Sequence, residues 1–107
     1  MKPDPKLLDE LVRRIVEAVH PLRIILFGSA ARGEMGPNSD LDVLVVMPDG
    51  VHRRQTAQFI YRQLIGFGFA SDILVATPTD LETHATNPGL IYKEVLNEGR
   101  EIYHAET

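Results

Sequence analysis

Three aspartates stand where a buried strand would normally carry apolar residues. Asp40 and Asp42 are two positions apart at the start of the apolar run Leu41–Met47, so a strand there would place both carboxylates on one face. Asp72 stands near the start of a second apolar run, 70–76. Clustered carboxylates repel one another and favour a hard divalent cation, Mg²⁺ with Mn²⁺ as its substitute. Such a cluster needs a cation or shared protons, and an Asp-x-Asp pair on one strand can hold two such ions, an arrangement used for in-line displacement at phosphorus.

A phosphate-binding loop is predicted directly upstream of these aspartates. The apolar run Ile24–Phe27 opens into Gly28 and Ser29, and the small residues that follow suit a loop with one helical turn. Glycine lets backbone approach a ligand closely, and amides at a helix N-terminus bind anions. Ser29 adds a hydroxyl donor, and Arg32 adds a forked cation suited to phosphate oxygens. Gly28, Ser29 and Arg32 are thus predicted to bind a nucleotide, and a magnesium nucleoside triphosphate would satisfy both halves of the site.

Alternating helices and strands are predicted to position these residues. The hydrophobic periodicity and the turn residues predict helices over 5–20, 51–65 and 89–97, a helical turn from 78, strands over 24–27, 41–47 and 70–76, and a short last strand at 102–103. The helix between the second and third strands is long enough for them to pair in parallel. Parallel pairing would bring Asp40, Asp42 and Asp72 to one edge of the sheet, within an α/β fold.

Length and charge restrict the functions that this sequence can have. The 107 residues are expected to form a single domain, 1–107, with no room for a separate acceptor-binding domain. Eleven Lys and Arg against fifteen Asp and Glu give a net charge of −4, which argues against broad nucleic-acid binding. There is no cysteine, and no long apolar segment predicts export or membrane insertion. A cytoplasmic location is expected.

Some of these residues also fit plainer roles. Asp40 follows a turn-forming stretch and, taken alone, fits a turn cap, whereas Asp42 has no such explanation within an apolar strand. Arg32, taken alone, fits a solvated surface position. The segment 51–71 contains three arginines and no acidic residue, which fits either a solvated helix face or a contact with a nucleotide or partner.

The spacing of these motifs resembles that of the DNA polymerase beta-type nucleotidyltransferase superfamily, in which Gly-Ser precedes an Asp-x-Asp strand. Here Gly28-Ser29 is separated from Asp40-Leu41-Asp42 by ten residues. The stretch LFGSAARGEMGPNSDLDVLVV is most similar to the minimal nucleotidyltransferase (MNT) subgroup. The resemblance implies a nucleotidyltransferase fold: a small mixed β-sheet flanked by helices, in the order α-β-α-β-α-β with a C-terminal helix. Asp72 matches the third carboxylate of the family.

The resemblance also implies a reaction. ATP would bind with its triphosphate on the glycine-serine loop, and two magnesium ions would be held by Asp40, Asp42 and Asp72. An acceptor hydroxyl would attack the α-phosphorus, pyrophosphate would leave, and Asp72 would act as the general base. Family members often carry arginine at the position of Ala30, so Arg32 would contact phosphate alone or with Arg53 and Arg54.

The resemblance finally implies a partner. Proteins of this kind are commonly paired with a small helical HEPN-type protein as a toxin–antitoxin module, in which the MNT member is the antitoxin and adenylylates the toxin. The expected partners are therefore ATP and a HEPN-type protein encoded nearby, in a hetero-oligomeric complex. Two alternatives remain open at this point: a non-catalytic antitoxin that acts by complex formation, and a nucleotidyltransferase for a small molecule such as an antibiotic.

Overall fold

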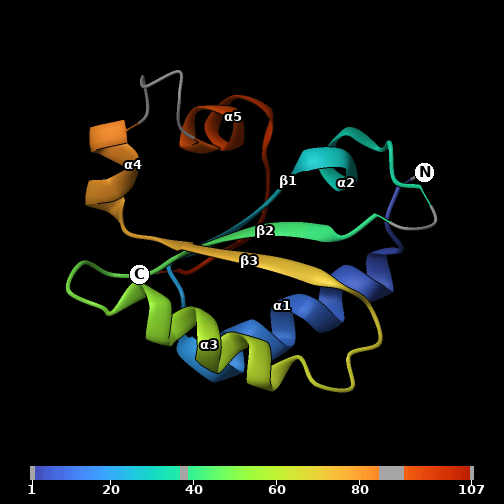
Figure 1. The fold of residues 1–107 in the computed structure, drawn as a ribbon, viewed down its shortest axis with the longest axis horizontal. Coiled ribbons are helices and arrows are strands. Elements are labelled where there is room, and N and C mark those ends of the chain that lie inside the picture. Colours follow the sequence, from blue (N-terminus) through green and yellow to red (C-terminus); the bar gives the residue numbers. More distant parts are fainter. Residues whose placement is uncertain (1, 37–38, 85–90, 107) are drawn as a thin grey trace.

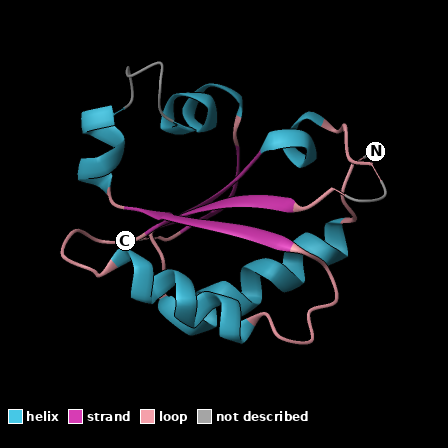
Figure 2. Cartoon of the chain, in the orientation of Figure 1, coloured by secondary structure: helices cyan, strands magenta, loops and turns pink. Residues whose placement is uncertain are grey.

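A four-stranded mixed sheet forms the centre of the fold (Figures 1 and 2). The structure is a computed structural model that describes residues 2–36, 39–84 and 91–106. Its elements, in chain order, are α1 Pro5–Val19, β1 Arg23–Phe27, α2 Gly28–Arg32, β2 Leu41–Val46, α3 Arg53–Gln63, β3 Ser71–Ala76, α4 Pro78–His84, α5 Ile91–Glu98 and β4 Arg100–His104. The predicted α/β fold with a mixed sheet is confirmed. Of the helix predicted over 89–97, residues 89 and 90 lie outside the described part.

The strand order is β3-β2-β1-β4. Strands β2 and β3 are parallel, as the crossover through α3 predicted, whereas β1 is antiparallel to both β2 and β4. The end of β1 therefore meets the start of β2, with Phe27 opposite Asp42, and the start of β3 lies beside it, with Asp72 opposite Asp42. Both predicted halves of the site consequently lie at one edge of the sheet.

Helices cover both faces of the sheet. One core packs side chains of α1 and α3 against Leu41, Val43 and Val45 of β2. The other packs side chains of α4 and α5 against Leu44 and Val46 of the same strand. Figure 1 shows this layering, with α1 and α3 on one side of the sheet and α2, α4 and α5 on the other. Since side chains alternate along a strand, Asp42 shares the face of Leu44, on the side of α2 and α5.

Helix ends account for small differences from the predicted bounds. Helix α1 begins at Pro5 because the Asp4 carboxylate accepts the Lys6 N–H at 2.9 Å. Helix α3 begins at Arg53, two residues later than predicted, because the His52 Nδ1 accepts the Gln55 N–H at 3.2 Å. Strand β4 is longer than the short strand predicted at 102–103 and pairs with β1. No helix in the described ranges combines the length and apolar character that crossing a membrane requires.

Candidate functional site

Asp42 and Asp72 lie directly opposite each other on the parallel strands β2 and β3. The pKa of Asp42 is raised, first by burial of its carboxyl and then by the negative charges of Asp72 and Asp40. Asp40 is exposed and immediately precedes β2. The structure therefore brings the three predicted carboxylates to one edge of the sheet, close enough for their charges to interact.

Gly28 packs against the Asp42 carboxylate. Its backbone has φ +68°, a conformation that side chains disfavour, and a Cβ built at this position would collide with the Asp42 Oδ2. The sequence pattern suggested that glycine is needed here so that a phosphate can approach. The structure adds a second reason within the protein itself, because the Asp42 carboxylate needs the same space.

Ser29 and Ala30 lie in the single turn of α2, which starts where β1 ends. Ser29 is half-buried, and its carbonyl accepts the Glu34 N–H at 2.8 Å, which closes the loop beyond Gly33. Ala30 is only 2% exposed and belongs to the buried cluster that also contains residues of β1 and β2. The position that carries arginine in the resembling family thus contributes to packing in this chain.

Arg32, the predicted phosphate ligand, forms ion pairs with three carboxylates. Its guanidinium lies 3.0 Å from Glu34, 3.4 Å from Glu98 and 3.6 Å from Glu94, and the hydrogen bond with Glu34 is the main cause of its raised pKa. Its positive charge opposes the rise in the pKa of Asp42. A triphosphate that binds Arg32 must therefore compete with these glutamates.

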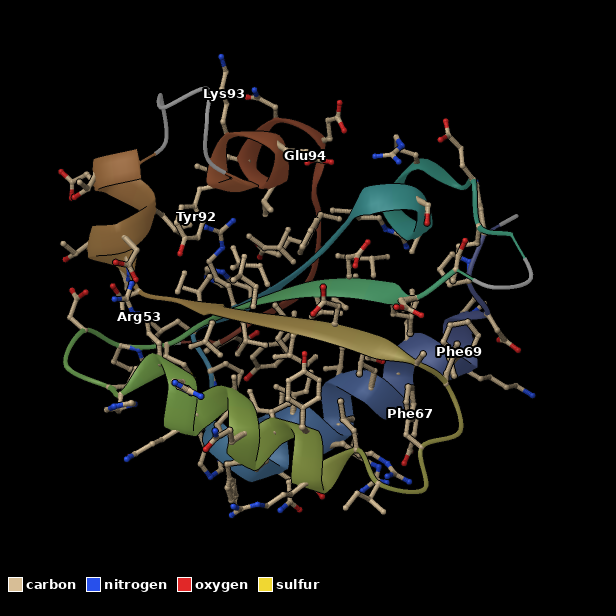
Figure 3. All side chains as sticks on the ribbon, in the orientation of Figure 1. Arg53, Phe67, Phe69, Tyr92, Lys93 and Glu94 are labelled. Carbon is tan, nitrogen blue, oxygen red and sulfur yellow. The ribbon has the colours of Figure 1, made fainter. Side chains whose placement is uncertain are left out.

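Glu94 is a fourth carboxylate near the site, and the sequence analysis missed it. It comes from α5, the helix beside α2 (Figure 3), and its charge contributes to the raised pKa of Asp42. Glu98, one helical turn later, shares its contact with Arg32. The only signal in the sequence was the spacing of four residues between two acidic side chains, which puts both on one helix face.

Tyr61 of α3 contacts the start of β3, beside Asp72. Its hydroxyl accepts the Ile73 N–H at 2.8 Å and donates to the Asp72 Oδ1 at 3.2 Å. Burial, followed by the negative charge of Asp72, raises the pKa of Tyr61, so the hydroxyl remains a donor at neutral pH. Tyr61 was not predicted from the sequence either, because a tyrosine within an amphipathic helix is typical of packing.

The three aspartates are not arranged as a finished metal site. Among the residues that the structure describes, no three His, Asp or Glu side chains are placed to hold one metal ion. Their donor chemistry nevertheless fits a hard divalent cation, since its charge would offset both the burial and the repulsion that raise the pKa of Asp42. The predicted two-ion magnesium centre stays a prediction.

Arg53 and Arg54 do not lie at this edge. Arg53 forms an ion pair with Asp80 at 2.9 Å, and Asp80 belongs to α4, which follows the far end of β3. Figure 3 shows Arg53 at the opposite end of the sheet from Phe69, which lies two residues before the start of β3. The expectation that these arginines assist Arg32 is therefore not supported by where α3 starts.

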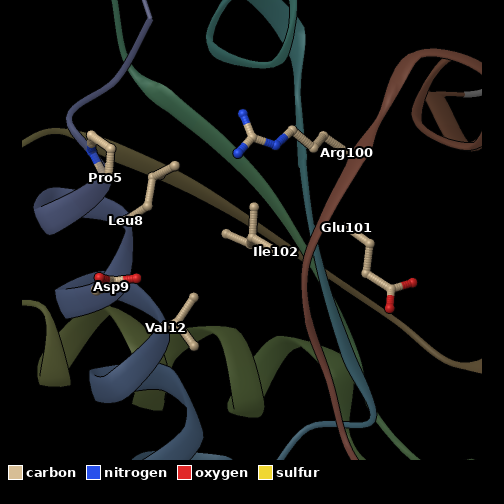
Figure 4. A pocket seen from close by; sticks show the side chains of 7 residues that line it. All are labelled: Pro5, Leu8, Asp9, Val12, Arg100, Glu101 and Ile102. Carbon is tan, nitrogen blue, oxygen red and sulfur yellow. The ribbon is translucent and has the colours of Figure 1, made fainter.

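Two of the hollows in the part of the chain that the structure describes border α1, and neither is lined by the three aspartates. Figure 4 shows one of about 230 Å³ between α1 and β4, where Leu8 and Val12 face Ile102. It lies at the β4 end of the strand order, away from β3. A second, of about 300 Å³, is mostly apolar and includes Leu7, Met35 and Phe69 in its lining. Phe69 of this lining lies three residues before Asp72 in the chain.

Comparison with known proteins agrees with the motifs. The family model of a nucleotidyltransferase domain matches residues 6–102. No curated protein is a significant match by sequence. A Sulfolobus solfataricus protein assigned as a nucleotidyltransferase shares the fold with a TM-score of 0.66 and 21% identity, over 95% of this chain and 81% of its own.

Toxin–antitoxin complexes are also similar in structure. A toxin–antitoxin structure with AMP-PNP has a TM-score of 0.66 and 18% identity, over 92% of this chain and 74% of the matched chain. A Shewanella oneidensis complex of a tri-AMPylated HEPN toxin with its MNT antitoxin has a TM-score of 0.54 and 16% identity, over 94% and 71%. At these identities the likeness shows a common fold. Together with the family match, it confirms the resemblance inferred from the Gly-Ser and Asp-x-Asp motifs.

Proposed function

Because the chain belongs to the nucleotidyltransferase domain family, which its residues 6–102 match, we propose that it transfers AMP from ATP to a hydroxyl of a partner protein. The observation that carries this proposal is the in-register pairing of Asp42 with Asp72, with Gly28 packed on the Asp42 carboxylate. We treat residues 1–107 as one such domain, located in the cytoplasm.

The loop after β1 is proposed to bind the triphosphate. Gly28 and Ser29 offer backbone amides in the first turn of α2, and the Ser29 hydroxyl adds a donor. Arg32 would exchange its glutamate partners for phosphate oxygens, which match its forked donors equally well. The exchange keeps the guanidinium charge balanced, since phosphate and carboxylate are both anionic.

Asp40, Asp42 and Asp72 are proposed to hold magnesium, as two ions, which when bound offset the negative charge of the triphosphate and of the leaving pyrophosphate. Helix α5 also affects the charge of the site. Glu94 adds negative charge near Asp42, while Arg32 offsets part of it. The site is therefore strongly anionic as it stands and suited to a cationic ligand.

The reaction proposed for this site is a single displacement at phosphorus. The acceptor oxygen forms a bond to the α-phosphorus, and the bond from that phosphorus to the bridging oxygen of pyrophosphate breaks. Asp72 accepts the proton that the acceptor hydroxyl loses. A carboxylate can act as this base because it takes up the proton while the new bond to phosphorus forms. Ser29 and Arg32 hold the phosphates in place meanwhile.

A HEPN-type toxin encoded beside this protein is the proposed acceptor. Support comes from the fold shared with the MNT antitoxin complex of a tri-AMPylated HEPN toxin. A second candidate function is neutralisation of the toxin by binding alone. Two observations favour it: a buried alanine, Ala30, stands where family members often carry arginine, and Arg32 already pairs with three carboxylates.

Transfer of label distinguishes these functions. The protein, the product of the adjacent reading frame, magnesium and α-labelled ATP are incubated together, with Asp42→Asn as the inactive variant and Asp9→Asn as a matched control on α1. AMP transfer predicts label on the partner with the wild type and with Asp9→Asn, and none with Asp42→Asn. Neutralisation of the toxin without label, equal in all three proteins, would instead support binding alone.

A further inference from the structure

The Tyr61 hydroxyl joins α3 to the outer edge of the sheet beside Asp72. Strand β3 is an edge strand, so amides that do not bond to β2 point outward and need another partner. The Ile73 N–H finds that partner in the Tyr61 oxygen, at 2.8 Å. A helix on one face of the sheet thereby reaches the strand that carries a predicted catalytic carboxylate.

The direction of the two hydrogen bonds follows from the chemistry of the hydroxyl. A phenol has one proton to donate and lone pairs to accept. Since the Ile73 amide can only donate, it occupies a lone pair, and the phenol proton is left for the Asp72 Oδ1, 3.2 Å away. The backbone of β3 therefore fixes the hydroxyl, and the hydroxyl in turn restrains one oxygen of the neighbouring carboxylate.

We propose that Tyr61 is a positioning residue that holds the Asp72 carboxylate in one rotamer, with Oδ1 engaged by the phenol and Oδ2 left to accept the acceptor proton. This inference rests on the proposed function for its consequence in catalysis. The restraint itself is a property of α3 and β3 in the free protein. A carboxylate on an exposed strand edge would otherwise sample several rotamers, each of which presents its oxygens differently.

The restraint can be measured without any reaction. In the wild type, NMR couplings between the α- and β-protons of Asp72 should report one staggered rotamer. In Tyr61→Phe they should shift toward the average over rotamers, and the Ile73 amide should exchange with solvent faster. Tyr103→Phe removes the same hydroxyl from β4, across the sheet, and should change neither reading. Averaged Asp72 couplings already present in the wild type would overturn the proposal.

Kinetics test the consequence for catalysis. Tyr61→Phe should lower kcat for transfer by about 10- to 100-fold, while KM for ATP and ATP binding by calorimetry stay within about twofold of the wild type. An unchanged kcat despite faster Ile73 exchange would make the contact purely structural and overturn the proposal. Label from α-labelled ATP on Tyr61 would also overturn it, since the hydroxyl would then be an acceptor. Rotamer restraint in a wild type that transfers no label would refute the proposed function while leaving the restraint intact.

Discussion

The Asp42 carboxylate occupies the space that a side chain at position 28 would need. Gly28 directly follows β1, whose last residue, Phe27, lies opposite Asp42, so the phosphate-binding loop packs against the carboxylate strand here. The glycine-serine loop and the Asp-x-Asp strand are therefore in direct contact in this chain, and a substitution in one should affect the other.

Gly28→Ala tests this coupling. A methyl group at φ +68° is strained and collides with the Asp42 Oδ2, so the variant should lose about 1–3 kcal/mol of stability in urea denaturation, together with transfer activity. In an Asp42→Ala background the collision is largely removed. The stability lost through Gly28→Ala should then shrink by about 0.5 kcal/mol or more. Strictly additive losses in the double mutant would show that the two residues are not coupled.

The raised pKa of Asp42 predicts how stability depends on pH. The folded protein holds the Asp42 proton to a higher pH than the unfolded chain does, so the stabilisation from this group is complete below the unfolded pKa and is lost as pH rises through the folded value. At pH 7 the ionised carboxylate is destabilising, and Asp42→Asn should unfold at a higher temperature than the wild type. The difference should vanish near pH 3, where both side chains are neutral.

Asp9→Asn removes one carboxylate from the exposed side of α1 and controls for a general charge effect in that experiment. A lower unfolding temperature of Asp42→Asn at pH 7 would contradict the prediction. The expected result is that Asp42→Asn is more stable than the wild type but inactive. Such a result is typical of a site where function is maintained at the expense of stability.

Arg32 should govern ATP affinity. Loss of a charged hydrogen-bonding partner costs about 1.5–3 kcal/mol, so Arg32→Ala should raise KM for ATP by at least about tenfold. Glu98→Gln removes a competing carboxylate 3.4 Å from the guanidinium and should lower KM by a few-fold at low salt. If Arg32→Ala lowers stability without changing KM, the guanidinium serves only to tie α2 to α5.

The start of α4 provides a stability prediction that should leave catalysis unaffected. Thr77 and Asp80 form reciprocal hydrogen bonds: the Asp80 carboxylate accepts the Thr77 N–H at 3.0 Å, and the Thr77 hydroxyl accepts the Asp80 N–H at 3.3 Å. Thr77→Ala should cost about 1 kcal/mol in thermal or urea unfolding. Because α4 follows the far end of β3, KM and kcat of the folded variant should match the wild type.

The sequence was most informative where the evidence was local. Alternation along β2 and the length of the α3 crossover were enough to predict that Asp42 and Asp72 share one edge, and the register confirms it. Contacts between distant segments could not be predicted in the same way. Glu94 reaches Arg32 only because α5 packs beside α2, and Tyr61 reaches Asp72 only because α3 crosses the outer strand. Neither side chain interrupts its local pattern, so neither drew attention as Asp42 did in its apolar strand.

The proposed reaction cleaves ATP at the α-phosphorus and leaves the nucleoside monophosphate on the partner. Parallel reactions with α-labelled and γ-labelled ATP test it most directly, with the protein, the partner and magnesium present and EDTA added to a matched sample. Only the α-label should be found on the partner, pyrophosphate should be released in equal amount, and EDTA or Asp42→Asn should abolish both. Partner labelled from γ-labelled ATP, or no label from either, would contradict it.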